Sequence, residues 1–286
     1  MASSTTNQAF LLGYRLYLLA FFVFLAAPLV AAGSFAFNDS LFPSLPWQGF
    51  TLDWFFNDTE PKLGMFHDRR LLRGLYYSGV IGAFVSALAV FVGTTNAFLF
   101  VRGNFPAKNF FYILMILPLV IPGVILGISI LVMASNIANG IEDKFNYELE
   151  FLRPGILLVV FGQFSFVTTI TSLIITARLK KFDTSLEEAA LNLGASRAQV
   201  LRSVTLPYLR PAMIAAAIVA FLVSFENFNT TLFLVGSESP LTITMYDRMA
   251  KVGSTPVLNA VSFFLIVGSG VLALISVVIQ RDTPTE

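Results

Sequence analysis

Apolar residues gather into six long stretches along this chain of 286 residues, and charged residues are concentrated between them. The stretches span residues 16–37, 74–101, 109–135, 154–177, 212–236 and 256–280. Only the fifth contains a charged residue, Glu226. A helix rises about 1.5 Å per residue, so each stretch is long enough to cross a hydrocarbon layer about 30 Å thick. The pattern predicts an all-α integral membrane protein with about six transmembrane helices.

Composition favours the same interpretation. Hydrophobic residues make up 56% of the chain and charged residues 12%, and the mean hydropathy is +0.77. Soluble domains carry about 25% charged residues, so a soluble fold of this composition would expose too much apolar surface. Each stretch also far exceeds the roughly ten residues of a barrel strand, and helices satisfy their own backbone groups in lipid. We therefore expect a single transmembrane domain over residues 1–286.

Several kinds of chemistry lack the necessary residues. The chain has no cysteine and one histidine, His67, which leaves almost no material for thiol chemistry or a histidine-rich metal site. A net charge of +1 gives no basic surface for a nucleic-acid partner. No phosphate-binding loop of the G-x-x-x-x-G-K-[ST] type occurs, so the chain is not expected to hydrolyse ATP by that mechanism. A membrane enzyme based on Glu226 would need a second acid, a histidine or a cysteine in another stretch, and none is present.

The first stretch has two interpretations. Arg15 precedes an apolar run that ends in small residues, as in a cleavable signal. A retained helix instead gives an even number of spans with both termini on one side. With both termini inside, ten basic residues lie on the cytoplasmic side and eight outside, which favours cytoplasmic termini. The inside residues are Arg15, Arg102, Lys108, Arg178, Lys180, Lys181, Arg197, Arg202, Arg210 and Arg281.

Proline and glycine interrupt the third stretch. Pro118 and Pro122 stand close to Gly123 and Gly127, and proline inside a helix removes a hydrogen bond and bends the chain. The bend could serve ordinary helix packing or could shape a pore.

The segment 178–211 between the fourth and fifth stretches is expected to form two short helices. Ser185 and Glu188 have the spacing of a capping box, and Gly194 is expected to end the first helix. Ser196 and Gln199 offer a second capping box. Pro207 and Pro211 are expected to end the segment.

The first of these helices carries an apolar face at helical spacing, formed by Leu186, Ala189, Ala190 and Leu193. Exposure of such a face costs about 25 cal/mol per Å². A partner is therefore expected to cover it, either another part of this chain or a separate protein.

The same segment resembles the EAA signature of ATP-binding-cassette importer permeases. The resemblance rests on Glu188, Ala189 and Ala190, then Gly194, then Val204, Thr205, Leu206 and Pro207, at fixed offsets over twenty residues. It implies a type I importer permease fold in a bacterial cytoplasmic (inner) membrane. It further implies that Glu188, Ala189, Ala190 and Gly194 form a coupling helix that docks on an ATPase subunit, and that Leu206 and Pro207 anchor its return to the membrane.

The resemblance also implies an assembly. Two permease chains, this one with a homologous partner or a second copy, would stand over a dimer of ATPase subunits and receive cargo from an external substrate-binding protein. ATP and Mg would bind to the ATPase partner, and this chain would bind no cofactor.

Further matches resemble the spermidine/putrescine branch of the family. They comprise Trp47, Gln48, Gly49, Phe50, Thr51, Asp53 and Trp54; Ser224, Phe225, Glu226, Asn227 and Phe228; and Lys251, Val252 and Gly253. That branch often has two adjacent acids where this chain has Glu226 and the neutral Asn227. A single carboxylate puts a multiply charged polyamine in doubt and leaves a monoamine, an amino-acid-derived amine or selection by the binding protein open.

Glu226 is the candidate cargo contact. A carboxylate within a transmembrane helix costs a few kcal/mol and must face protein or water. Asn229 and Thr230 lie three and four positions further on, so the three are expected to share one helix face that lines a polar passage, with Asn227 beside it. Alternatively, Glu226 ties helices together. Import of another small cargo, such as an anion or metal chelate, and proton-coupled transport through Glu226 both remain open.

Overall fold

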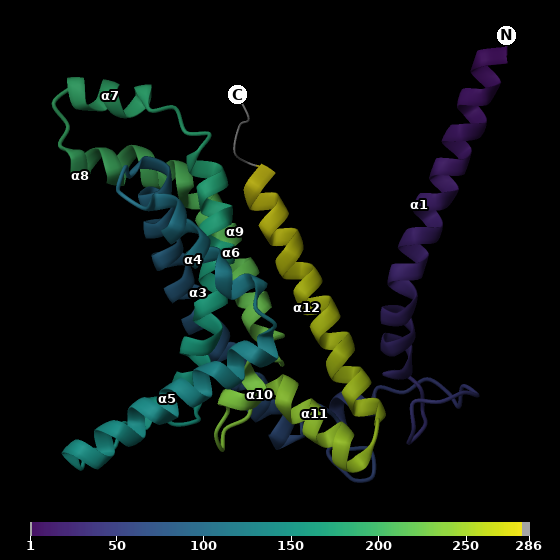
Figure 1. Ribbon diagram of the computed structural model, residues 1–286. Helices are drawn as coiled ribbons and strands as arrows, with labels where there is room; N and C mark the ends of the chain where they lie inside the picture. Colours follow the sequence, from purple (N-terminus) through teal and green to yellow (C-terminus); the bar gives the residue numbers. More distant parts are fainter. Residues whose placement is uncertain (1, 282–286) are drawn as a thin grey trace. The chain divides into compact units, whose positions relative to one another are not determined.

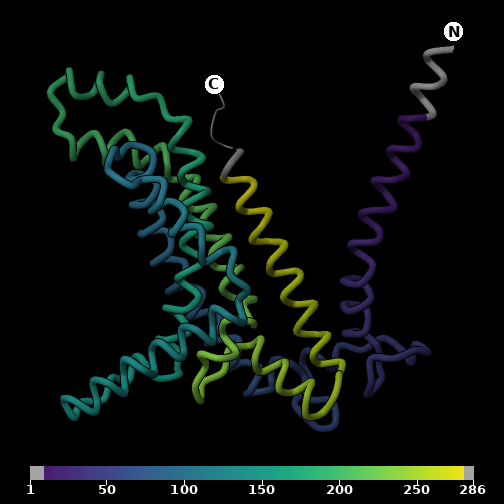
Figure 2. The backbone as a smooth tube through the Cα atoms, viewed as in Figure 1, coloured from purple at the N-terminus to yellow at the C-terminus, as the bar shows by residue number. Residues whose placement is uncertain are grey.

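The computed structural model describes residues 2–281, with side chains from residue 10 to residue 279. Figures 1 and 2 show that helices make up most of this part of the chain. The helices are α1 (Ala2–Phe35), α2 (Asp53–Phe56), α3 (Arg69–Arg102), α4 (Lys108–Val120), α5 (Gly123–Phe145), η1 (Glu150–Leu152), α6 (Ile156–Leu179), α7 (Ser185–Asn192), α8 (Arg197–Val200), η2 (Leu201–Thr205), α9 (Leu206–Phe225), α10 (Thr231–Leu234), α11 (Leu241–Val252) and α12 (Pro256–Arg281). Between residues 2 and 281 there is no β-strand, only an isolated bridge between Asn38 and Phe50.

Six helical segments in the described part are long and apolar enough to cross a membrane. The expected number of membrane helices is therefore confirmed. The stretches predicted at 16–37, 74–101, 154–177 and 256–280 correspond to α1, α3, α6 and α12. Their ends differ by a few residues, apart from the amino terminus of α1, because polar residues continue a helix beyond its apolar part.

The prediction of one continuous helix over 109–135 is wrong. The structure has α4 and α5 instead, separated at Ile121 and Pro122. Ile121 is extended, with φ −71° and ψ 130°, as expected for a residue that precedes proline. Figure 1 shows α5 leaving α4 at a steep angle. Pro118, by contrast, lies inside α4.

The prediction of one helix over 212–236 is also wrong. α9 starts earlier, at Leu206, and ends at Phe225, and the short α10 follows after residues 226–230. The expected segment 178–211 is correspondingly shorter, because α9 begins inside it.

The chain divides into two compact units. Unit 1 extends to Leu72 and includes Asp247–Ser269, and unit 2 comprises Arg73–Tyr246 and the residues from Gly270 onward. The expectation of one permease domain over residues 1–286 stays a prediction.

Helix α6 is the centre of unit 2. Val159, Val167 and Ile175, along its length, are fully buried, and its neighbours include α3, α4, α9 and α10. An all-round apolar sequence suits a helix that is enclosed on most sides. Small polar side chains bind across the contacts. Thr171 donates a hydrogen bond to the carbonyl oxygen of Ala89 in α3 over 2.7 Å, as is common between closely packed membrane helices.

Unit 1 is organised around Asn38, whose side chain is fully buried. Its amide group donates to the carbonyl oxygen of Ser44 over 3.1 Å and accepts from the backbone of Gln48 over 2.9 Å. The indole of the buried Trp54 donates to the carbonyl oxygen of Asn38 over 2.9 Å. These bonds explain how residues 38–54 can be ordered with little regular secondary structure.

Lys62 forms ion pairs with two acidic residues of the same segment. Lys62 binds Asp39 and lies 3.5 Å from Asp53. The hydrogen bond to Asp39 is the main reason why the pKa of Lys62 is raised above its ordinary value.

Candidate functional site

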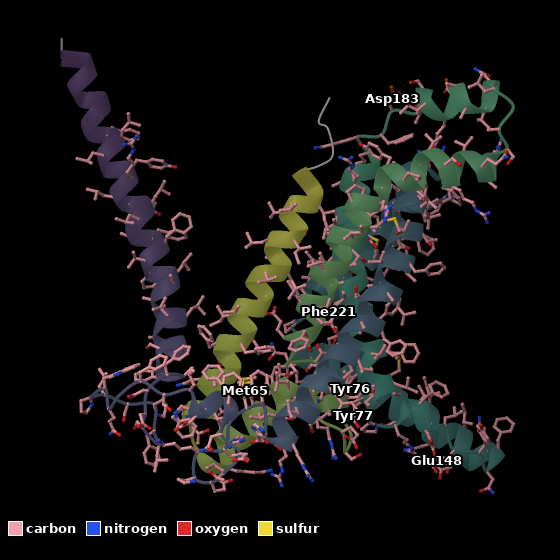
Figure 3. All side chains as sticks on the ribbon, turned by 180° about the vertical axis from the view of Figure 1, so that it is seen from behind. Met65, Tyr76, Tyr77, Glu148, Asp183 and Phe221 are labelled. Carbon is pink, nitrogen blue, oxygen red and sulfur yellow. The ribbon has the colours of Figure 1, made fainter. Side chains whose placement is uncertain are left out.

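The segment that was expected to dock on a partner forms a hairpin of α7 and α8 at one end of unit 2. The two helices lie side by side (Figure 1). Figure 3 shows Asp183 beside α7, and Glu148 at the opposite end of the unit, close to the end of α5. The hairpin therefore projects from the helical bundle as a separate surface.

The expected capping box of Ser185 and Glu188 does not form. Ser185 is the first residue of α7, and Thr184, which precedes it, makes no side-chain cap. The carboxylate of Asp183 accepts a hydrogen bond from the backbone N–H of Ser185 over 2.9 Å. This bond, together with one from the Ser185 side chain, lowers the pKa of Asp183 below its ordinary value. The prediction placed the cap two residues late.

The other end of α7 follows the prediction. Gly194 has a φ of +89°, which glycine adopts without the steric cost that a side chain brings. Ala195 donates its backbone N–H to the carbonyl oxygen of Ala190 over 3.1 Å. Ser196 and Gln199 form the expected capping box at the start of α8.

The predicted coupling residues lie mainly on the surface. Glu188, Ala189 and Gly194 are exposed, and Ala190 is half-buried. Leu193 beside them is 89% exposed and Leu186 52%. Most of the apolar face of α7 therefore remains uncovered within the described chain.

Leu206 and Pro207 occupy the first turn of α9. The helical backbone runs on from η2 into α9, and the Leu206 N–H donates to the carbonyl oxygen of Leu201. The expectation that Pro207 and Pro211 end the segment is wrong: both lie within α9, Pro207 in its first turn.

The sequence did not single out Glu187, which lies on the inner side of α7. Its carboxylate pairs with Arg102 at the end of α3, at 2.6 Å, and accepts a hydrogen bond from the hydroxyl of Thr205. No local pattern distinguishes Glu187 from Glu188, because its partners are distant in the sequence.

Glu226 does not lie in the middle of a helix. It directly follows the last residue of α9, and its side chain is exposed. Asn229 is also exposed, whereas Asn227 is half-buried and Thr230 is buried. The expected common helix face of Glu226, Asn229 and Thr230 is therefore wrong, because residues 226–230 form no helix.

A network of buried polar side chains stabilises the non-helical segment between α9 and α10. Gln163 of α6, 1% exposed, accepts a hydrogen bond from Ser224 and donates one to Thr231 over 2.8 Å. The side-chain oxygen of Asn227 accepts hydrogen bonds from the backbone and hydroxyl of Thr231 over 3.2 and 3.0 Å. The sequence analysis missed Gln163, although an amide within an apolar helix is a recognisable signal.

The break after α9 meets the break before α5. The hydroxyl of Thr230 donates to the carbonyl oxygen of Gly123 over 3.3 Å. A Cβ atom at Gly127 would lie 2.8 Å from the carbonyl oxygen of Thr230, so glycine permits the close approach. Two interrupted helices thus meet beside α6, an arrangement that transporters use to place polar backbone next to cargo.

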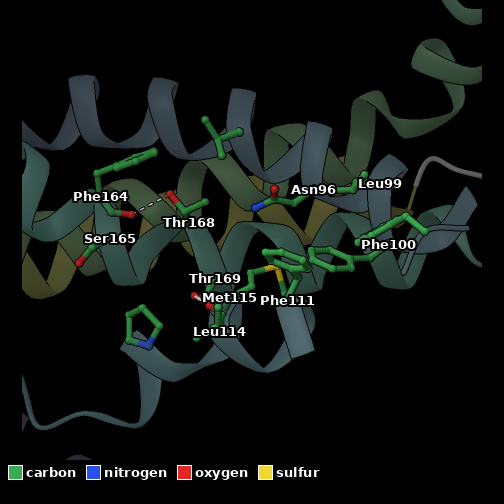
Figure 4. Close-up of a pocket in the computed structure, with 13 residues that line it drawn as sticks. Asn96, Leu99, Phe100, Phe111, Leu114, Met115, Phe164, Ser165, Thr168 and Thr169 are labelled. Carbon is green, nitrogen blue, oxygen red and sulfur yellow. Dashed lines mark hydrogen bonds between the residues drawn. The ribbon is translucent and has the colours of Figure 1, made fainter. Parts of the chain in front are cut away.

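A cavity of about 660 Å³ lies between α3, α4 and α6 (Figure 4). Its walls include Phe100, Phe105, Phe111 and Phe164. The hydroxyl groups of Thr168 and Thr169 in the wall donate to backbone carbonyl oxygens. The cavity is therefore a mainly apolar recess with engaged hydroxyl groups, and it is distinct from the exposed Glu226.

Residues 86–281 match the family model of the binding-protein-dependent transport system inner membrane component. This chain belongs to that family. The permease is accordingly a non-catalytic subunit of an ATP-binding-cassette importer and a multi-pass inner membrane protein.

Curated relatives of the permease include polyamine transporters. It is 28% identical over 260 residues to the putrescine transport system permease protein PotI of Escherichia coli (strain K12), which covers 91% of this chain and 87% of that protein. It is 29% identical to the spermidine/putrescine transport system permease protein PotC of the same organism, with 93% of each chain covered. The molybdenum transport system permease protein ModB, also from that organism, is 32% identical over 69% of this chain and 88% of ModB.

Solved structures share the fold of the permease. A bacterial ABC transporter involved in the import of the acidic polysaccharide alginate matches with a TM-score of 0.71 and 18% identity, over 96% of this chain and 95% of that one. The MetNI methionine ABC transporter in an inward-facing conformation gives a TM-score of 0.55 at 18% identity, over 76% of this chain and 95% of that one. The expected importer permease architecture is therefore confirmed.

Proposed function

We propose that this permease imports a small organic cation of the polyamine class, driven by ATP hydrolysis on a separate ATPase dimer. The ATPase, with its ATP and Mg, docks on α7 through Glu188, Ala189, Ala190 and Gly194. A second permease, homologous or identical, completes the passage, and an external binding protein delivers the cargo. Both termini of the chain lie in the cytoplasm.

The observation that carries the proposed cargo is the match to polyamine permeases over more than nine tenths of the chain. The site agrees with it. Glu226 offers an exposed carboxylate at the carboxyl end of α9, and the partial negative charge at that end of a helix also attracts cations. A carboxylate in the passage favours an amine over an anion.

Glu226 has no neighbouring acid in the sequence, and the side-chain oxygen of Asn227 is engaged with Thr231. Glu226 therefore supplies one negative charge to the cargo. The other charges of a polyamine would be met elsewhere along the passage, by the second permease or by the binding protein.

An oxyanion is the second candidate cargo, because the molybdenum permease ModB is 32% identical to this chain. That match extends over 69% of the chain, a smaller share than in the polyamine relatives. An anion would also be repelled by Glu226. The two candidates differ in the sign of the charge that the passage must accept.

Uptake by cells that depend on this chain tests the cargo. Labelled putrescine, spermidine and molybdate are compared for wild type, Glu226→Gln and the control Asp143→Asn, which alters another exposed acid. We expect amine uptake to fall about tenfold in Glu226→Gln, because the loss of one charged contact worth about 1.4 kcal/mol changes an equilibrium by that factor. Amine uptake should remain normal in the control. Uptake of molybdate without uptake of an amine would show that the cargo is an oxyanion. Unchanged amine uptake in Glu226→Gln would show that Glu226 does not contact the cargo.

The energy source is tested by copurification. The tagged chain is expected to recover an ATPase subunit, and Glu188→Arg to lose it, because the added charge and bulk lie on the exposed face of α7. Amine uptake that survives ATP depletion and stops with a proton uncoupler would instead support proton-coupled transport through Glu226.

A further inference from the structure

The carboxylate of Glu187 joins three helical segments, α7, α3 and η2. Glu187, in the first turn of α7, lies 2.6 and 2.8 Å from the Nη1 atom of Arg102, the last residue of α3. The same carboxylate accepts a hydrogen bond from Thr205, at the end of η2. The partners of Glu187 are 85 and 18 residues away in the sequence. We call Arg102, Glu187 and Thr205 the clamp.

Arg102 is fixed from the α3 side as well. Its guanidinium group lies over the rings of Phe98 and Phe182, 5.4 and 5.5 Å from their centres. Its positive charge at the carboxyl end of α3 is favourable for the helix. A guanidinium in contact with two rings and a carboxylate is restrained from several sides, so movement of Glu187 is expected to pull on the end of α3.

Thr205 connects the clamp to α9. It is fully buried, and it closes a five-residue π-helical turn, Leu201–Thr205, directly before α9. Such turns are rare and are frequently found at functional sites. A displacement of Glu187 therefore reaches the beginning of α9 as well as the end of α3.

Glu187 and Glu188 have opposite surroundings. The side chain of Glu187 is 17% exposed and is engaged within unit 2, whereas Glu188 is exposed. The ion pair of Arg153 and Glu142 has a similarly exposed arginine, 33% against 31% for Arg102, but a more exposed glutamate, at 45%, and its members are 11 residues apart. The clamp differs from such surface pairs because it joins three separate segments.

We propose that Glu187 is a positioning residue that makes α7, the end of α3 and the start of α9 move together. This inference rests on the proposed function, because it requires an ATPase to move α7. Glu188 serves the docking contact, and Glu187 passes the displacement to two membrane helices at once. Loss of the clamp is expected to uncouple transport from ATP hydrolysis while the ATPase remains bound.

The absence of cysteine from the sequence permits a direct test. Cysteines introduced at Leu99 in α3 and at Thr184 directly before α7, both exposed and outside the proposed docking residues, carry spin labels in the complete transporter. The distance between the labels is measured without nucleotide and after trapping with MgATP and vanadate. The variants are Glu187→Gln, Arg102→Gln, the exchange Glu187→Arg with Arg102→Glu, and the control Arg153→Gln.

We expect the distance between the labels to be the same in both states for wild type and Arg153→Gln. In Glu187→Gln and Arg102→Gln the two states are expected to differ by more than the width of the wild-type distribution. Uptake per bound ATPase is expected to fall about tenfold in these variants, within the usual range of coupling between sites. The exchange variant is expected to recover part of the uptake, because it restores the ion pair.

Three results would overturn the inference. The first is an equal distance between the labels in both states in the single variants. The second is a fall in ATPase recovery in proportion to uptake, which would mean that Glu187 only stabilises the contact with the ATPase. A wild-type chain that binds no ATPase would overturn the proposed function itself and the inference with it.

Discussion

The hydroxyl group of Thr230 donates a hydrogen bond to the carbonyl oxygen of Gly123, 3.3 Å away, and joins two interrupted helices. Thr230 belongs to the break between α9 and α10, and Gly123 begins α5 after the break at Pro122. Neither break is a free end, since each is held by the other. Substitutions at this contact should therefore affect both.

Gly127→Ala tests the close approach. The added Cβ atom would lie 2.8 Å from the carbonyl oxygen of Thr230, so one backbone must shift. We expect a cost of about 1–3 kcal/mol, as for overpacking elsewhere, seen as a lower apparent melting temperature of the purified chain in detergent. Gly140→Ala, in the same helix with open space around it, should leave the melting temperature unchanged or slightly raised. Equal melting temperatures for all three chains would contradict the contact.

Gln163→Leu tests the buried network. It removes the acceptor of the buried Ser224 hydroxyl, and an unsatisfied buried group costs about 1–3 kcal/mol. The Thr231 hydroxyl loses the hydrogen bond from Gln163 but keeps the one to Asn227. The triple variant with Ser224→Ala and Thr231→Val removes both hydroxyl groups too. Thermal unfolding in detergent should show that the triple variant loses less stability than the sum of the three single variants. Simple additivity would show that the three side chains do not act together.

The two broken helices illustrate what sequence can and cannot predict. Length and apolar composition were sufficient for six membrane helices, because both follow from bilayer thickness. The break at Pro122 could have been found, since proline disfavours helical backbone at the preceding residue. The break after Phe225 has no proline or glycine. Its signal is Asn227, whose side chain binds the backbone of Thr231 and so offers a local alternative to the helix.

The candidate site could be predicted from the sequence only in part, because local patterns are visible in a sequence and contacts between distant residues are not. Glu188, Ala189, Ala190 and Gly194 belong to a local pattern, and their positions on and after α7 follow from it. The roles of Glu187 and Gln163 depend on partners that only the folded chain brings close, 85 residues away for Arg102 and 68 for Thr231. No periodicity in the sequence reports such a pairing.

Acidification should loosen the start of α7. The pKa of Asp183 is lowered by the hydrogen bond from the backbone of Ser185. A lowered pKa in the folded state means that the ionised carboxylate stabilises the fold, and that this contribution is lost as the pH falls below about 4. Hydrogen exchange of the amides in the first turn of α7, corrected for the intrinsic effect of pH, should show decreasing protection over that range.

Asp183→Asn supplies the comparison. The amide does not ionise in this range, so protection of the first turn should be independent of pH between about 3 and 6. Persistence of the same pH dependence in Asp183→Asn would assign it to another group.

Asn38→Ala should loosen the segment from residue 38 to residue 54. The substitution removes the acceptor of the Gln48 backbone N–H and the donor to Ser44, with an expected cost of about 0.5–1.5 kcal/mol for each hydrogen bond lost, because Gln48 and Ser44 are exposed and water can take the place of the amide. Limited proteolysis should cut this segment faster than in wild type. Asn57→Ala, at a half-buried asparagine whose side chain is hydrogen-bonded to its near neighbour Thr59, should be cut at the wild-type rate.

The contact of the two breaks has a mechanical consequence. Four helical pieces, α4, α5, α9 and α10, are tied at one junction and lean on α6, so they have fewer independent degrees of freedom than four separate rods. A permease built in this way would change shape mainly by tilting the joined pieces as a lever about that junction. For α9, the greatest travel would then occur at its first residues, which follow the hairpin of α7 and α8 along the chain.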